Sequence, residues 1–169
     1  MSGPDILVLT GGVGGAKLLK GLAEVLPPGR ICAAVNTGDD FEHLGLRVCP
    51  DLDTTVYTLA GLADPVRGWG RHDESWSFMA ALEELGGPTW FQLGDRDLAL
   101  NVWRTQALAA GASLSEFTAK VCGQLGVEVR VLPMSDDAVR TELETDEGLL
   151  PFQDYFVRRR CEHHGEQRT

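Results

Sequence analysis

The chain has 169 residues, of which 43% are hydrophobic and 24% charged, and its formal net charge is −10. This composition is typical of a folded globular domain, and the negative charge argues against nonspecific binding to nucleic acid or to an anionic membrane. No apolar run could span a bilayer, no basic segment precedes the first apolar run, and the four cysteines form no CxxC pair, so we expect a cytoplasmic protein.

The first 35 residues predict a βαβ unit. The apolar run 5–10 predicts a buried strand, and a helix is expected over residues 16–26, where leucines recur at helical spacing. A Pro-Pro-Gly segment ends that helix, and Ile31–Val35 is the next apolar strand. Because a strand, a crossover helix and a second strand form a parallel pair, the predicted fold class is α/β with a Rossmann-like parallel sheet.

The rest of the chain predicts a helical insertion followed by more strands. Residues 36–45 are expected to form a polar loop. Helices are expected over residues 51–63, 74–85, 95–110 and 113–125, the last opened by a Ser113/Glu116 capping box. Strands are expected over residues 127–132, 139–145 and 152–157. The tail 161–169 loses all apolar patterning, so we expect a domain over residues 1–160 and a disordered end.

A glycine-rich loop, Gly11-Gly-Val-Gly-Gly15, separates the first strand from the first helix. Backbone amides at a helix N-terminus bind phosphate, and glycine permits close approach. The loop is neither a P-loop, since Ala16 and Leu18 flank Lys17, nor a dinucleotide fingerprint, which needs a third glycine at that lysine. The alternative is a tight turn that only packs the helix on the strand. We predict phosphate or nucleotide contact through Gly11, Gly12, Gly14, Gly15 and Lys17.

Two acidic segments follow the second predicted strand. The first is Asn36-Thr-Gly-Asp-Asp40, and the second, Pro50-Asp-Leu-Asp53, opens a helix. The carboxyl ends of parallel strands face the ligand crevice, and Mg²⁺ prefers oxygen ligands. Each segment also has a structural explanation, as a turn or as a favourable first helical turn. Together they predict a substrate site that includes Asn36 and Thr37 and a metal site at Asp39, Asp40 and Asp51.

Arg96 stands at the start of a predicted helix, where a cation meets the positive end of the helix dipole. A residue placed against local preference often serves a ligand. Arg104 lies about 80° round the helix from it, so both side chains could face one anionic group. The alternative is a surface salt bridge between Arg96 and its neighbours Asp95 and Asp97.

Seven motifs then make a family resemblance visible. In chain order they are Thr10-Gly-Gly-Val-Gly-Gly-Ala-Lys17, Val35-Asn-Thr-Gly-Asp-Asp40, Pro50-Asp-Leu-Asp-Thr54, Gly68-Trp-Gly70, Leu93-Gly-Asp-Arg-Asp-Leu98, Leu132-Pro-Met-Ser-Asp-Asp137 and Phe152-Gln-Asp-Tyr-Phe156. The ordered set resembles the N-terminal half of the 2-phospho-L-lactate transferase family, from about residue 6 to residue 160. Members of that family are about twice as long, so the resemblance implies a sheet truncated at its C-terminus.

The resemblance implies a Mg²⁺-assisted transferase. A phospholactyl or phosphoenolpyruvyl group would move from a guanosine diphosphate-linked donor to the ribityl hydroxyl of the deazariboflavin Fo, with release of GMP. It implies catalytic roles for Asp53, Arg96 and Asp40, with Asp53 and Arg96 contacting Fo. The helical spacing to Arg96 predicts that Arg104 lies in the same substrate site. A homodimer is left open.

Two other functions remain open. One is a non-catalytic regulator of carbon metabolism from the same superfamily, which binds a nucleotide or nucleotide sugar and shares the glycine loop and Asn36-Thr-Gly-Asp-Asp40. The segments around Asp53 and Arg96 favour the transferase. The other is a nicotinamide-dependent oxidoreductase, which the incomplete fingerprint disfavours.

Overall fold

The computed structural model describes residues 4–146 and 148–161. The first elements are β1 (Ile6–Thr10), α1 (Gly12–Val25), η1 (Pro28–Arg30), β2 (Ile31–Val35), β3 (Phe41–His43) and β4 (Leu46–Val48). The helical section contains α2 (Pro50–Leu59), α3 (Ser77–Glu84), α4 (Asp95–Ala109) and α5 (Leu114–Gln124). The last elements are β5 (Arg130–Pro133), β6 (Glu142–Thr145), β7 (Gly148–Pro151) and the π-helix η2 (Asp154–Arg158).

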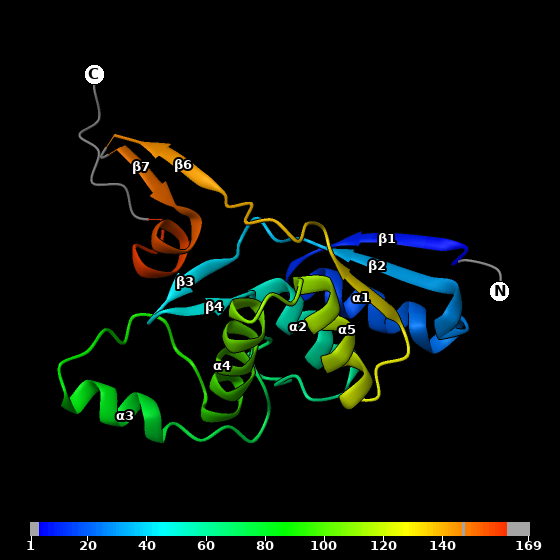
Figure 1. Ribbon diagram of the computed structural model, residues 1–169, viewed down its shortest axis with the longest axis horizontal. Helices are drawn as coiled ribbons and strands as arrows, with labels where there is room; N and C mark the ends of the chain where they lie inside the picture. Colours follow the sequence, from blue (N-terminus) through cyan, green and yellow to red (C-terminus); the bar gives the residue numbers. More distant parts are fainter. Residues whose placement is uncertain (1–3, 147, 162–169) are drawn as a thin grey trace.

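The main sheet is parallel, with strand order β1-β2-β5. Helices α1, α2 and α5 cover one of its faces (Figure 1). The core between them is formed by Leu19 of α1, Val35 of β2, Val56 of α2 and Phe117 of α5, each at most 3% exposed. The predicted α/β class and the first βαβ unit are therefore confirmed, and β1 and β5 are the two edge strands.

Two antiparallel hairpins stand outside this sheet, β3–β4 and β6–β7 (Figure 1). The prediction that residues 36–45 form only a polar loop was wrong, because Phe41–His43 is a strand. Its burial alternates, with Phe41 and His43 buried and Glu42 exposed, which is the period of a strand with one buried face.

The strand predicted over residues 152–157 was also wrong. That segment forms η2, and Phe152 stacks on Phe156 with ring centroids 5.3 Å apart. Side chains four residues apart lie on one face of a helix, so this pair favours a helical turn. The predicted tail 161–169 lies outside the described residues except for Cys161.

The predicted helices are present with shifted ends: α1 begins at Gly12, within the segment predicted as a glycine loop, whereas α3 begins only at Ser77. Helix α4 begins at Asp95 as expected, and α5 carries the predicted capping box: Ser113 Oγ accepts from the Glu116 amide and Glu116 accepts from the Ser113 amide. In the described parts of the chain, no helix is long and apolar enough to cross a membrane.

Candidate functional site

The glycine loop packs tightly against the two acidic segments. Gly11 precedes α1 in extended conformation, and Gly12 has φ +63°, a left-handed value that favours glycine. A Cβ atom on Gly11 would lie 2.6 Å from Asp51 Oδ2 and 3.0 Å from Asn36 Cβ. The structure therefore brings the carboxyl end of β1, the end of β2 and the start of α2 together, as predicted for a ligand crevice.

The glycines of the loop have different surroundings. A Cβ atom on Gly15 would lie 2.1 Å from Thr10 Oγ1, so Gly15 lets α1 approach β1. Gly14 is exposed and has no atom within 4 Å of its Cβ position, and Lys17 is exposed one turn further on. The open side of the first turn of α1 is therefore available to a ligand, because its first amides have no partner in the helix.

Gly11→Ala and Gly14→Ala form a matched pair of variants that tests this packing. We expect Gly11→Ala to lower the free energy of unfolding by about 1–3 kcal/mol, since the methyl group must displace Asp51 and Asn36. Gly14→Ala should be neutral or stabilising by up to about 1 kcal/mol, because alanine favours the helix. Urea denaturation of both variants measures the difference, and equal effects would mean that Gly11 has no special role in packing.

Asn36 links the loop after β2 to the start of α2. Its Nδ2 donates to Asp51 Oδ2 at 3.0 Å, and its Oδ1 accepts from the Gly38 amide at 3.0 Å. Burial and then the charge of Asp51 raise the pKa of Asp39, while the Asn36 side chain acts in the opposite direction. Asp39 and Asp51 thus lie within electrostatic reach of each other beside the glycine loop. Thr37, which follows Asn36 in the chain, is buried at 2% exposure.

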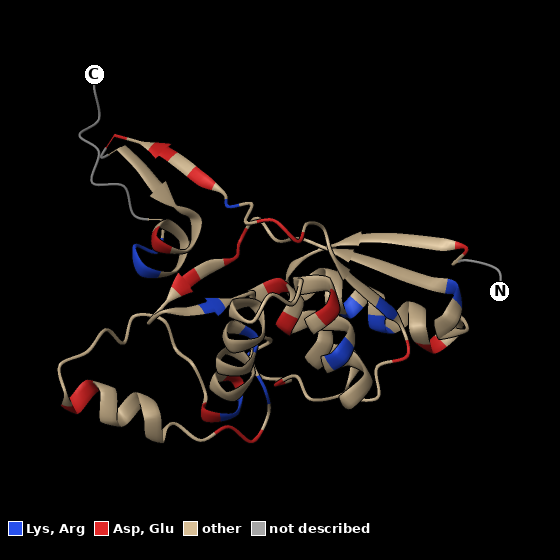
Figure 2. Ribbon diagram, viewed as in Figure 1, with Lys and Arg blue, Asp and Glu red and all other residues tan. Residues whose placement is uncertain are grey.

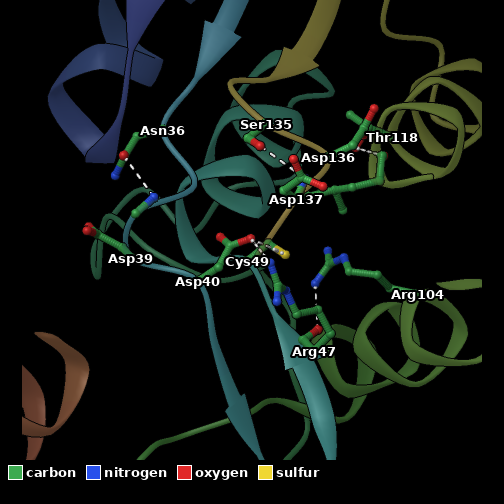
Figure 3. Close-up of polar contacts among 12 residues, drawn as sticks. Asn36, Asp39, Asp40, Arg47, Cys49, Arg104, Thr118, Ser135, Asp136 and Asp137 are labelled. Carbon is green, nitrogen blue, oxygen red and sulfur yellow. Dashed lines mark hydrogen bonds and ion pairs between the residues drawn. The ribbon is translucent and has the colours of Figure 1, made fainter. Parts of the chain in front are cut away.

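Asp40 faces away from Asp39 (Figure 3). Its Oδ2 accepts from Arg47 Nη2 at 3.2 Å and from Cys49 Sγ at 3.0 Å, and the residue is 2% exposed. Burial raises the pKa of Asp40, and the contacts with Cys49 and Arg47 oppose that rise. Asp40 is therefore part of a buried polar contact between the loop and β4.

The structure does not bring the three predicted metal ligands together, because Asp40 points to Arg47 and Cys49 and away from Asp39 (Figure 3). Within residues 4–146 and 148–161, no group of three His, Cys, Asp or Glu side chains is placed to hold a metal ion. The carboxylates that remain adjacent are Asp39 and Asp51. Chain spacing could not separate Asp39 from Asp40, since neighbouring residues in a turn can face opposite ways.

Arg104 and Asp53 form a buried ion pair between α4 and α2. Their side chains are 3% and 10% exposed. Arg104 also donates from Nη1 to Arg47 O at 3.1 Å and to Asn101 Oδ1 at 2.9 Å. Burial acts to lower the pKa of Arg104, but the Asp53 carboxylate together with Cys49 and Tyr57 outweighs it, and the net shift is upward. The geometry does not support the expectation that Arg104 and Arg96 bind one anionic group, because the Arg104 guanidinium is already paired with Asp53.

Arg96 is exposed, and its aspartate neighbours have other partners. Asp95 accepts from Ser75 Oγ at 2.7 Å, and Asp97 accepts from Tyr57 Oη at 2.7 Å. Hydrogen bonds and ion pairs within the described residues leave the Arg96 guanidinium without a partner, so the predicted alternative of a local salt bridge is not observed. This leaves Arg96 able to contact a ligand.

Glu74 is a structural residue that sequence reasoning missed. Its carboxylate accepts from the amides of Arg96 at 2.8 Å and Asp97 at 2.9 Å, and so caps the start of α4. Acidic groups stabilise a helix N-terminus, which offsets the unfavourable position of Arg96. No local signal could reveal this cap, because Glu74 lies 22 residues before Arg96 in the chain.

Asp97 makes the stability of the protein depend on pH. Burial, followed by the charge of Asp53, raises the pKa of Asp97 to about 7 from an ordinary value of 3.8. Because the folded pKa lies above the unfolded one, its stabilising contribution is full below about pH 3.8 and is lost as pH rises through about 7. The Asp97→Asn variant keeps an acceptor for Tyr57 and has no carboxyl group to titrate. We expect its free energy of unfolding, relative to that of the parent, to increase from pH 5 to pH 8. Urea denaturation at both pH values measures this gain, and a pH-independent difference would contradict the assignment.

Comparisons with known proteins agree with these motifs. The family model of 2-phospho-L-lactate transferase CofD matches residues 6–168. A phosphoenolpyruvate transferase of Kitasatospora aureofaciens is 51% identical over 159 residues, which cover 90% of this chain and 50% of that protein. Proteins of the same name from Streptomyces griseus and Mycobacterium tuberculosis are 48% and 44% identical; the matches cover 92% and 93% of this chain and 51% and 54% of those proteins. The chain spans about half the length of the curated relatives it matches.

Proposed function

Because this chain belongs to the 2-phospho-L-lactate transferase family, we propose that it carries the phosphate and acceptor site of a transferase. The enzyme moves a phosphoenolpyruvyl or phospholactyl group from a guanosine diphosphate-linked donor to the ribityl hydroxyl of Fo and releases GMP. The names of the curated relatives favour the phosphoenolpyruvyl group.

The observation that carries this proposal is the contact of the glycine loop with the two acidic segments. Gly11 lies against Asn36 and Asp51 at the start of α1, where free backbone amides suit a diphosphate. With a net charge of −10, the chain needs such local compensation to bind an anionic donor.

Asp39 and Asp51 suit Mg²⁺, because this ion is commonly held by one or two carboxylates together with water and substrate phosphates. Burial and, after it, the charge of Asp51 raise the pKa of Asp39, so a cation between the two carboxylates would relieve their repulsion. When bound there, Mg²⁺ would neutralise charge on the donor. Asp40 does not fit this set, since it pairs with Arg47.

The transfer is an in-line displacement at phosphorus. The ribityl oxygen attacks the phosphorus that bears the three-carbon acid, its proton passes to an aspartate of the site, and the bond to GMP breaks with the electron pair leaving on GMP. The glycine-loop amides orient the diphosphate, and the free guanidinium of Arg96 contacts the substrate. We propose that Asp53 and Asp40 act indirectly, by holding α2 and the loop after β2 through Arg104 and Arg47.

Fo-dependent release of GMP distinguishes this function from that of a non-catalytic regulator. The assay uses the chain joined to the half of the Kitasatospora aureofaciens relative that it does not match (the joined protein), with the unmodified relative as control. We expect GMP only when Fo and Mg²⁺ are both present, loss of release in EDTA, and recovery when Mg²⁺ is added back. Full release in EDTA would contradict a metal-assisted mechanism. A folded joined protein that binds the donor without releasing GMP would favour the regulator.

A further inference from the structure

Two carboxylates tie the starts of helices α3 and α4 to each other. Glu74, in the segment that leads into α3, accepts from the amides of Arg96 and Asp97 at 2.8 and 2.9 Å. Asp95, the first residue of α4, accepts in return from the amides of residues 77–78 of α3 at 3.1 and 3.0 Å. Figure 2 shows acidic residues in both segments. Each segment thus caps the helix that the other one begins, and we call these two carboxylates with their amides the reciprocal cap.

Further contacts tighten the reciprocal cap. The Asp95 amide donates to Ser75 O at 2.9 Å, and Ser75 Oγ donates to Asp95 Oδ2 at 2.7 Å. The hydrogen bond from Ser75, followed by those from the α3 amides, lowers the pKa of Asp95. Gly94 is buried, and a Cβ atom there would clash with the Glu74 carboxyl group, so only glycine permits this approach. The main chain at residue 96 is therefore held from two sides, while the Arg96 side chain stays exposed.

A closed loop, residues 64–71, lies between the reciprocal cap and the glycine loop. The Asp64 amide donates to Gly70 O at 3.1 Å, and the Asp64 carboxylate accepts from two amides within the loop at 2.8 and 3.0 Å. A Cβ atom on Gly68 would lie 3.5 Å from Cγ1 of Val13, in the first turn of α1. The loop therefore packs beside the free amides that we assign to the diphosphate.

Arg67 connects this loop to the reciprocal cap. Its guanidinium carbon lies 4.6 Å from the centroid of the Trp76 ring and 5.8 Å from that of Trp69, within the range of cation–π contacts. Trp76 is the N-cap residue of α3 and follows Ser75 of the reciprocal cap. A series of packed groups thus runs from the first turn of α1 to the backbone at residue 96.

We infer that Glu74 and Asp95 are positioning residues for the transfer, because they hold the backbone of α4 where the Arg96 guanidinium can reach a substrate bound at the glycine loop. This inference rests on the proposed function. The two carboxylates offset the positive end of the helix dipole without pairing with the arginine, so its guanidinium stays free. A fixed main chain also reduces the conformational freedom that Arg96 loses when it contacts a ligand.

A double-mutant cycle in the joined protein tests whether Glu74 acts through Arg96. Glu74→Gln leaves an acceptor for only one of the two α4 amides. We expect it to lower kcat/KM for Fo about tenfold in the parent but less than about twofold in the Arg96→Ala background, where the group that it positions is gone. Glu83→Gln is the matched control, since Glu83 is an exposed carboxylate of α3 outside the reciprocal cap. It should change kcat/KM less than about twofold in either background.

Amide hydrogen exchange in the 15N-labelled 169-residue chain gives a readout that needs no activity. Glu74→Gln should speed exchange of the Arg96 and Asp97 amides about fivefold or more, because they lose a carboxylate acceptor. Since the caps are reciprocal, Asp95→Asn should speed exchange of the same two amides, although it does not bond to them. Glu83→Gln should leave both rates unchanged.

Equal losses of kcat/KM from Glu74→Gln with and without Arg96 would overturn the inference, since Glu74 would then affect activity independently of Arg96. Unchanged exchange at residues 96 and 97 in Asp95→Asn would overturn it as well. The proposed function fails in a different way, if the parent joined protein releases no GMP, and the positioning role then falls with it. An active joined protein with additive variants would remove only the positioning role.

Discussion

Replacing Arg104 by alanine is expected to lower the free energy of unfolding by about 3–5 kcal/mol. The substitution removes a buried guanidinium, 3% exposed, and leaves the Asp53 carboxylate without its counter-charge. It also leaves Arg47 O and Asn101 Oδ1 without a donor. Urea denaturation at pH 7 measures this loss.

Arg96→Ala is the matched control in the same helix. Arg96 is exposed and has no side-chain partner within the described residues, so its loss should change stability by less than about 0.5 kcal/mol. A small effect of Arg104→Ala, comparable with that of the control, would show that the pair with Asp53 does not hold α2 against α4.

Arg96 should matter for catalysis, although its side chain contributes little to stability. In the joined protein, Arg96→Ala is expected to lower kcat/KM for Fo by about one to two decades, the value of one charge-assisted hydrogen bond to a ligand. The melting temperature should stay nearly unchanged, because Glu74 caps α4 through backbone amides that the substitution leaves in place.

Lysine at position 96 should restore part of the activity, since it keeps the charge but lacks the planar fork. Steady-state kinetics and thermal denaturation must be measured on the same preparations. Unchanged kinetics together with a clear loss of stability would assign Arg96 to a structural role.

The parts of the fold that the sequence predicted are those encoded locally. The apolar runs of β1 and β2, the leucine spacing of α1 and the Ser113/Glu116 capping box each lie within a few residues. β3 was missed because three residues are too few to show a period. η2 was mistaken for a strand because Phe152, Tyr155 and Phe156 are residue types enriched in strands, and periodicity does not distinguish helix from strand over so short a segment.

For the site, the sequence predicted which segments lie close together but not which charged side chains pair. The proximity of Gly11, Asn36 and Asp51 follows from parallel strands whose carboxyl ends meet at one edge. The partners of the buried charges do not follow, since Asp53 and Arg104 are 51 residues apart. Only tertiary packing shows which of the predicted charged groups pair with each other, as Asp53 does with Arg104 and Asp40 with Arg47.

Mass spectrometry of the acceptor product is the most direct test of the proposed transferase. The joined protein is incubated with Fo, Mg²⁺ and the guanosine diphosphate-linked derivatives of phosphoenolpyruvate and phospholactate in parallel. We expect Fo to gain the mass of one phosphoenolpyruvyl or phospholactyl group, with one GMP formed for each modified Fo. Unmodified Fo from a joined protein that is folded and binds the donor, under conditions in which the Kitasatospora aureofaciens relative converts it, would contradict the assignment.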